Sequence, residues 1–164
     1  MDQLLPIAEQ IGTKLIERAE TIGISESSSG GLISAALLAI PGASRFYRGG
    51  GIIYTPQAFR GLMHLGREDL GGARSATEPY ALLMARTIRA RVDATWGLCE
   101  TGASGPDGNA YGDAAGHTCI GLCGGNNDTY SEVARTLETG RSDRPANMYS
   151  FAAAALDLLH ESLS

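Results

Sequence analysis

Near its start the sequence reads Ile22-Gly23-Ile24-Ser25-Glu26-Ser27-Ser28-Ser29-Gly30-Gly31, and the apolar residues 32–40 follow directly. The first four residues are typical of a short buried strand, and the serines and glycines are typical of a tight loop. The apolar stretch after the loop predicts a helix, which Pro41-Gly42 ends. A strand that passes through a glycine-rich loop into a helix is the basic unit of an α/β fold.

The segments on either side predict further helices and strands. Apolar residues recur every three or four positions over residues 4–22, which predicts an amphipathic helix before the quoted stretch. After it we expect a strand over residues 49–54 and a short helix over residues 57–63. Thr77 is a suitable N-cap for a long helix over residues 78–91, because a hydroxyl can accept a hydrogen bond from a free N–H of the first turn.

The second half of the chain predicts three more strands and a last helix. Residues 94–101 form a β-rich run that ends in a glycine-rich loop, and residues 117–123 and 129–138 are two strands joined by the Gly- and Asn-rich residues 124–128. Residues 144–163 predict the last helix. The alternation of strands and helices, followed by a hairpin, indicates a three-layer α/β/α sandwich around a mixed, mostly parallel sheet of about five strands.

Composition narrows the class of protein. At 164 residues and 43% hydrophobic content, we expect a single domain over residues 1–164. No apolar run is long enough to span a membrane and no signal peptide is evident, so we expect a cytoplasmic protein without a membrane partner. The net charge of −5 and the lack of a basic cluster argue against nucleic acid. The three cysteines and three histidines lack metal-ligand spacing, which predicts reduced, buried thiols and no metal site.

Two loops combine small residues with hydroxyl groups after predicted strands. The loop over residues 27–31 leads into a helix, whose N–H groups and dipole favour an anion such as phosphate or carboxylate, although serines that merely cap the helix give the same pattern. The loop over residues 101–108 is dense in glycine and is either part of a small polar pocket or a mobile turn. Neither loop has the spacing of a nucleoside triphosphate-binding or dinucleotide-binding motif.

Three segments taken together resemble the family of CinA C-terminal domains, the competence- and damage-inducible CinA-like proteins. They are residues 26–33, residues 41–50 (Pro-Gly-Ala-Ser-Arg-Phe-Tyr-Arg-Gly-Gly) and residues 101–108 (Thr-Gly-Ala-Ser-Gly-Pro-Asp-Gly). Residues 77–79 are similar to the family's Ser-Glu motif, and residues 142–144 are similar to its Gly-Asp-Arg motif. The resemblance spans nearly the whole chain, and it implies a three-layer α/β/α fold and commonly a homodimer.

The resemblance also implies a nicotinamide-nucleotide amidase, which hydrolyses the carboxamide of nicotinamide mononucleotide to the acid and ammonia without a metal or cofactor. Amide hydrolysis requires a nucleophile, a base, donors for the oxyanion and charges that hold the phosphate. By motif position the family's nucleophile falls on Ser44, with Ser27, Tyr54 and Thr101 as the other catalytic positions. The positions expected to bind substrate are Ser28, Ser29, Gly30, Gly31, Gly102, Gly105 and Arg144.

The chain departs from the family's pattern at the lysine that serves as general base. Phe59 stands at the corresponding position with Arg60 beside it, and neither side chain can accept a proton at neutral pH. Lys14, the only lysine, lies in the first predicted helix, where we expect a solvated surface charge.

Other departures surround this one. In the first loop Ser28-Ser29 replaces the family's Cys-Thr, Pro56 replaces an asparagine, and Glu100 stands where an apolar residue is expected. The candidates for a substitute base are Glu26, Glu100, Asp107 and Asp113, and each would require a pKa raised by burial.

Two hypotheses of different classes follow. The first is an amidohydrolase that acts on nicotinamide mononucleotide or a related nucleotide, with Ser44 as nucleophile. The second is a catalytically silent nucleotide-binding protein that has lost the base. A third, an unrelated binder of flavodoxin-like topology, requires the motif matches to be accidental.

Overall fold

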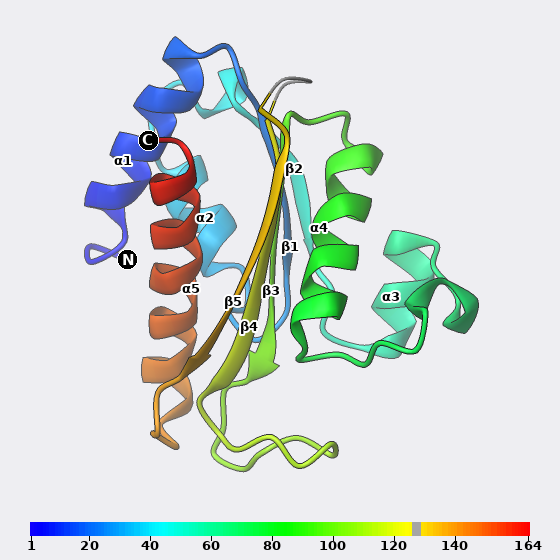
Figure 1. Ribbon diagram of the computed structural model, residues 1–164. Helices are drawn as coiled ribbons and strands as arrows, with labels where there is room; N and C mark the ends of the chain where they lie inside the picture. Colours follow the sequence, from blue (N-terminus) through cyan, green and yellow to red (C-terminus); the bar gives the residue numbers. More distant parts are fainter. Residues whose placement is uncertain (126–128) are drawn as a thin grey trace.

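The computed structural model describes residues 1–125 and 129–164 and contains one five-stranded sheet (Figure 1). The strand order is β2-β1-β3-β4-β5, in which β1 pairs in parallel with both β2 and β3. Strand β4 pairs antiparallel with β3 and with β5, so it alone among the described strands runs against the others. The predicted mixed, mostly parallel sheet is therefore confirmed. The strand bounds are β1 Ile22–Glu26, β2 Tyr47–Ile52, β3 Trp96–Ala103, β4 His117–Gly124 and β5 Ser131–Glu138.

Helices cover both faces of the sheet, which confirms the three-layer sandwich. Helices α1, α2 and α5 pack against one another on one face, and α4 lies on the other face with α3 beyond it (Figure 1). Their bounds are α1 Leu5–Glu17, α2 Leu32–Leu38, α3 Pro56–Met63, α4 Glu78–Arg91 and α5 Arg144–Ser162, with two 3₁₀ turns, η1 Ala43–Arg45 and η2 Arg67–Leu70. None of the helices in the described residues has the length and hydropathy needed to cross a membrane.

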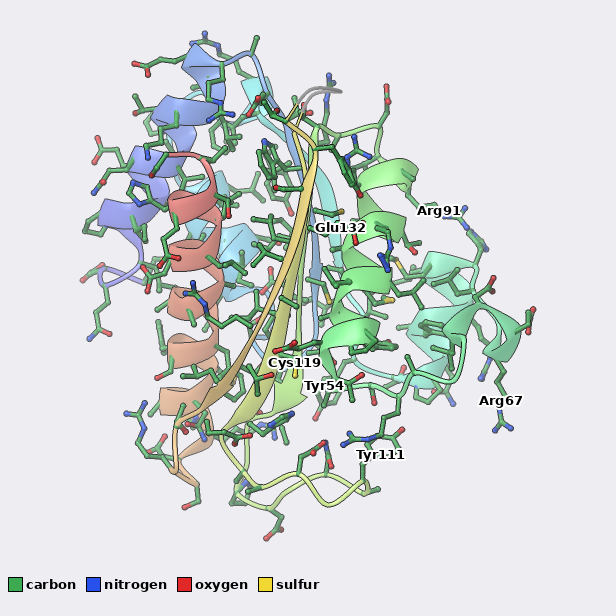
Figure 2. All side chains as sticks on the ribbon, in the orientation of Figure 1. Tyr54, Arg67, Arg91, Tyr111, Cys119 and Glu132 are labelled. Carbon is green, nitrogen blue, oxygen red and sulfur yellow. The ribbon has the colours of Figure 1, made fainter. Side chains whose placement is uncertain are left out.

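Each face of the sheet carries its own apolar core. Aliphatic side chains fill the space between the sheet and the three-helix layer, with Phe46 fully buried among them. On the α4 side the core is smaller and includes Met84, Ile88 and the three cysteines, which are free and buried as the sequence predicts. Figure 2 shows side chains packed on both sides of the sheet, whereas Arg67 lies at the periphery.

Helix α4 approaches the sheet closely because glycines lie beneath it. A Cβ atom added to Gly97 of β3 would overlap the Ala85 carbonyl, and one added to Gly121 of β4 would overlap the Ala81 backbone. Glycine at these two positions therefore sets the distance between the helix and the sheet.

Several predicted boundaries differ from the structure. The strand predicted over residues 49–54 lies two residues earlier, as β2, and the strand predicted over residues 94–101 lies two residues later, as β3. The first helix ends at Glu17 instead of continuing to residue 22, because Ala19 adopts a left-handed conformation (φ 52°) that reverses the chain into β1. The apolar Ile22, which continues the helical spacing, belongs to β1. The turn predicted over residues 124–128 lies partly outside the described residues, since residues 126–128 are not among them.

Candidate functional site

The strands β1, β2 and β3 are parallel, so their carboxyl ends meet at one edge of the sheet, where α/β proteins commonly bind ligands. The connections that follow these strands enclose a cavity of about 480 Å³. Its lining combines hydroxyl groups, backbone and aromatic rings: Ser27, Ile53, Tyr54, Thr55, Pro56, Phe59, Leu70, Ala73, Arg74, Ser75, Ala76, Tyr80, Thr101, Gly102, Asn109 and Tyr111.

Several residues that the resemblance singled out come together here. Ser27, Tyr54, Thr101 and Gly102 line the cavity. Arg144, at the start of α5, donates a hydrogen bond to the Tyr54 hydroxyl (2.9 Å) and another to the carbonyl of Gly105 (2.6 Å). These residues come from four separate parts of the chain, and the topology joins them beside one cavity.

Ser44 lies elsewhere. It is exposed in η1, which precedes β2, whereas the cavity follows the carboxyl end of β2. The carbonyl of Phe46 accepts a hydrogen bond from the N–H of Ile22, at the amino end of β1. At about 3.3 Å per residue, the length of β2 alone places Ser44 more than about 15 Å from Tyr54. The structure therefore does not bring the expected nucleophile together with Tyr54 and Thr101.

The loop over residues 27–31 already holds an anion, the carboxylate of Glu26. This fully buried carboxylate accepts hydrogen bonds from the N–H groups of Gly31 (2.9 Å), Ile33 (3.1 Å) and Ser34 (2.7 Å), and from the hydroxyls of Ser29 and Ser34. The N–H groups of the first turn of α2, which the sequence assigned to an anion, are thus satisfied from inside the protein.

The expected substrate-binding residues of this loop have internal partners. Ser28 and Ser29 are buried, and the Ser28 hydroxyl donates to the Gly102 carbonyl (2.6 Å), which joins the two predicted loops. Gly30 and Gly31 adopt left-handed conformations that form the turn into α2. Of residues 27–31, Ser27 is the one that lines the cavity.

Glu100 is a second buried carboxylate beneath the same loop. It accepts hydrogen bonds from the N–H groups of Ser27 (3.2 Å) and Ser29 (2.8 Å) and from the Thr118 hydroxyl (2.7 Å). Burial raises the pKa of the Glu100 carboxyl, and the hydrogen bonds from Ser29 and Thr118 oppose that shift. Because its oxygens face these donors, Glu100 fixes the loop beneath the cavity and does not line the cavity itself.

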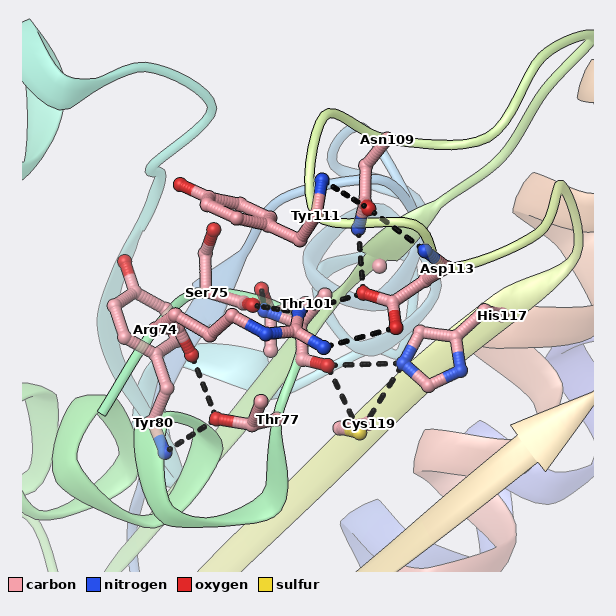
Figure 3. A network of polar contacts seen from close by, with 12 residues as sticks. Arg74, Ser75, Thr77, Tyr80, Thr101, Asn109, Tyr111, Asp113, His117 and Cys119 are labelled. Carbon is pink, nitrogen blue, oxygen red and sulfur yellow. Dashed lines mark hydrogen bonds and ion pairs between the residues drawn. The ribbon is translucent and has the colours of Figure 1, made fainter. Parts of the chain in front are cut away.

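An ion pair joins the connection that precedes α4 to the connection between β3 and β4 (Figure 3). Arg74, which precedes α4, makes a two-pronged contact with Asp113 in the β3–β4 connection (2.6 and 3.0 Å), and Asn109 also donates to Asp113 (2.8 Å). The guanidinium lies 5.1 Å from the centre of the Tyr111 ring. Arg74 lowers the pKa of Asp113 to about 2, so this carboxylate is a poor base near neutral pH.

An aromatic wall stands at the position of the family's lysine. Phe59 lines the cavity and stacks on Tyr80, with ring centroids 6.0 Å apart and an angle of 26° between the planes. Burial raises the pKa of Tyr80 well above its usual value. In the described chain, no Asp, Glu, His or Lys lines this cavity, and therefore no group that titrates near neutrality does.

His117 contacts Ala76, one of the residues that line the cavity. Its Nε2 lies 2.9 Å from the carbonyl of Ala76, and its Nδ1 contacts the carboxylate of Glu138. Both partners are acceptors, so both ring nitrogens must carry a proton for both contacts to be hydrogen bonds. Burial alone lowers the pKa of His117, but the contacts with Glu138 and Ala76 outweigh burial and raise it overall.

This arrangement predicts a pH dependence of stability. The pKa of His117 in the folded protein is above its unfolded value of about 6.5. The protonated ring therefore contributes fully to the free energy of unfolding below about pH 6.5, and this contribution is lost as the pH rises through the folded-state pKa. Urea unfolding between pH 6 and 9 is expected to show a decline that the variant His117→Asn lacks. The variant His160→Asn, which removes a histidine of α5 on the other face of the sheet, is the control and is expected to keep the decline. An equal decline in His117→Asn and the unmodified protein would contradict this role.

The comparisons with known proteins agree with the fold and the motifs. The family model of the CinA C-terminal domain matches residues 4–163. A "CinA-like protein" from Nostoc sp. is 33% identical over 96% of this chain, and one from Gloeothece citriformis is 33% identical over 93%. The chain spans only 38% and 36% of the length of these relatives.

Solved structures give the same result. The competence/damage-inducible protein CihA from Agrobacterium tumefaciens has a TM-score of 0.88 at 25% identity, with 98% of this chain and 96% of that chain covered. A CinA superfamily protein from Enterobacter cloacae also has a TM-score of 0.88, at 23% identity, with 98% and 92% covered. These structures share the fold, and the family match over residues 4–163, with the 33% identity to the Nostoc relative, shows that the chain belongs to the CinA C-terminal domain family.

Proposed function

We propose that this chain binds a small aromatic nucleotide in the cavity and does not hydrolyse nicotinamide mononucleotide. The observation that carries the proposal is the lining of the cavity. Phe59 stacks on Tyr80 where the resemblance expects a lysine, and the described residues that line the cavity include no Asp, Glu, His or Lys. A serine hydroxyl is a weak nucleophile unless a base within hydrogen-bonding reach removes its proton. Without such a base the cavity supports binding better than catalysis.

The binding half of the proposal rests on the remaining groups. Tyr54, Phe59, Tyr80 and Tyr111 offer apolar ring surface, and the hydroxyls of Ser27 and Thr101 offer polar contacts. Arg144, beside Tyr54, has no carboxylate partner among the described residues, which leaves its positive charge available for a phosphate. A ring joined to an anionic group matches this distribution.

The amidohydrolase is the second candidate, and two observations support it. Ser27, Tyr54 and Thr101 line the cavity, and Arg144 donates a hydrogen bond to Tyr54. In that case the nucleophile would be Ser44 or Ser27. Of these two serines, Ser27 lines the cavity, while Ser44 would have to act from the opposite edge of the sheet. Family membership also leads us to propose a cytoplasmic homodimer whose partner is a small nucleotide, and the acidic net charge of −5 argues against nucleic acid.

An assay of the purified protein with nicotinamide mononucleotide tests the proposal. We expect no ammonia above the rate without protein, together with a measurable heat of binding to the nucleotide or its acid. The variant Ser44→Ala should then bind as the unmodified protein does, to within about threefold, because Ser44 does not line the cavity. The variant Ser27→Ala should weaken binding by no more than about tenfold, which corresponds to the loss of one neutral hydrogen bond.

Phe59→Lys supplies the decisive comparison. If the loss of the base alone silenced the site, this variant is expected to gain turnover. Turnover by the unmodified protein that Ser44→Ala or Ser27→Ala abolishes would overturn the proposal and establish the amidohydrolase. The absence of any binding would overturn the nucleotide site itself.

A further inference from the structure

The wall formed by Arg74, Asp113 and Tyr111 contributes only the Tyr111 ring to the proposed function, and its Arg74–Asp113 ion pair has no role in that function or in the resemblance. We propose that Arg74 recognises a carboxylate on the ligand's ring, so that the cavity selects an aromatic acid nucleotide over the corresponding amide. This inference rests on the proposed function, since it concerns the ligand of the same cavity.

The geometry of Arg74 supports a recognition role. Asp113 holds the guanidinium by two hydrogen bonds, the carbonyl of Ser75 accepts a third (3.1 Å), and Tyr111 lies over its face. The same side chain lines the cavity. Its hydrogen bonds within the described part of the chain use both N–H groups of Nη1 and one of Nη2, which leaves its Nε–H and the other N–H of Nη2 without a partner there. Figure 3 shows how these contacts fix the direction of the side chain. A charged donor that is oriented before the ligand arrives binds with little loss of conformational entropy.

The chemistry of the guanidinium distinguishes an acid from an amide. Arginine donates hydrogen bonds and accepts none, so it matches both oxygens of a carboxylate. A carboxamide offers one acceptor oxygen, and its NH₂ group would face further donors. The discrimination is therefore made by complementarity of donors and acceptors.

The charges around the cavity favour the same ligand. Arg74 is the only ionised side chain among the described residues that line it. The buried carboxylate of Glu100, which precedes the lining residue Thr101, is occupied by hydrogen bonds from Ser27, Ser29 and Thr118. Asp113 offsets part of the charge of Arg74 from behind, which keeps the side chain in place. A second anionic group, the phosphate, would lie at Arg144, whose contacts are with Tyr54 and Gly105 and not with the Arg74 wall.

Calorimetric titration with two matched ligands tests the inference. Nicotinic acid mononucleotide and nicotinamide mononucleotide differ only in the group on the ring. We expect the acid to bind about tenfold more tightly, the difference between a charge-assisted and a neutral hydrogen bond. In Arg74→Gln the two dissociation constants should become equal to within about twofold.

Arg144→Gln is the matched control. It should weaken both ligands by a similar factor and leave their ratio unchanged, because it removes the phosphate partner. Arg74→Lys keeps the positive charge but loses the planar pair of N–H donors, so it should retain part of the preference for the acid over the amide. This variant tests the inference if Arg74→Gln does not fold. Equal or tighter binding of the amide by the unmodified protein, or an unchanged ratio in a folded Arg74→Gln, would overturn the role of Arg74 while leaving the nucleotide site standing. If neither ligand binds, the proposed function and this inference both fail.

Discussion

Replacing Glu26 by alanine is expected to lower the free energy of unfolding by about 4 kcal/mol. The carboxylate is fully buried and accepts five hydrogen bonds, three from backbone N–H groups at the start of α2 and two from the hydroxyls of Ser29 and Ser34. Without it all five donors lose their acceptor, and those of the buried Ser29 and Ile33 each cost about 1–3 kcal/mol before relaxation, while the half-buried Gly31 and Ser34 cost less. The start of the helix and the loop beneath the cavity are lost together.

Urea unfolding at neutral pH measures this loss. Glu161→Ala is the matched control, because Glu161 is exposed and pairs with Arg135 at the surface, where an ion pair contributes little to stability. The loss in the free energy of unfolding of Glu26→Gln should lie between the losses of Glu161→Ala and Glu26→Ala, because an amide keeps one acceptor oxygen but places an NH₂ group among other donors. A loss below about 1 kcal/mol in Glu26→Ala would mean that water replaces the carboxylate.

The variant Gly121→Val is expected to destabilise the protein by about 3 kcal/mol or more. A Cβ atom at position 121 would overlap the backbone of Ala81, and the obstacle is helix α4 itself and not a side chain that can rotate away. Since α4 lies across β3 and β4, the helix must shift as a unit, which disrupts its packing on the sheet.

Gly61→Ala serves as the control for the glycine itself. Gly61 lies in α3, and a Cβ atom there would meet nothing within 4 Å. Alanine favours a helix over glycine by about 1 kcal/mol, so this variant should be slightly more stable than the unmodified protein. Thermal unfolding of both variants gives opposite shifts if close packing at Gly121 is the cause. A decrease of similar size in both would show that glycine acts through the backbone alone.

The layers of the fold follow from periodicity and from the positions of the glycines. The helix over residues 78–91 has the bounds that its N-cap and apolar spacing predict, and β4 and β5 match the predicted hairpin strands within two residues at each end. The predicted first helix is too long because the apolar spacing alone continues to Ile22, while the reversal at Ala19 depends on a left-handed conformation that residue type does not reveal.

The site was only partly predictable. The motifs led to Ser27, Tyr54, Thr101 and Arg144, which the structure places around one cavity. They did not lead to the Arg74–Asp113 pair, whose members are 39 positions apart, since no local pattern reports which distant charges meet. The carboxylates were visible in the sequence, but their roles depend on donors that only the fold supplies. A charged residue inside an apolar strand, as at Glu100, is the one local signal that could have drawn attention to such a pairing.

Most of the cavity wall lies on connections, whereas the burial that stabilises the fold lies on strands and helices. Residues 104–116, for example, supply Asn109 and Tyr111 to the cavity, and Pro106–Gly108 and Tyr111 are exposed. Selection can therefore alter what this edge of the sheet recognises at little cost to folding. Library mutagenesis confined to the β3–β4 connection is for this reason a practical route to new ligands on the same scaffold.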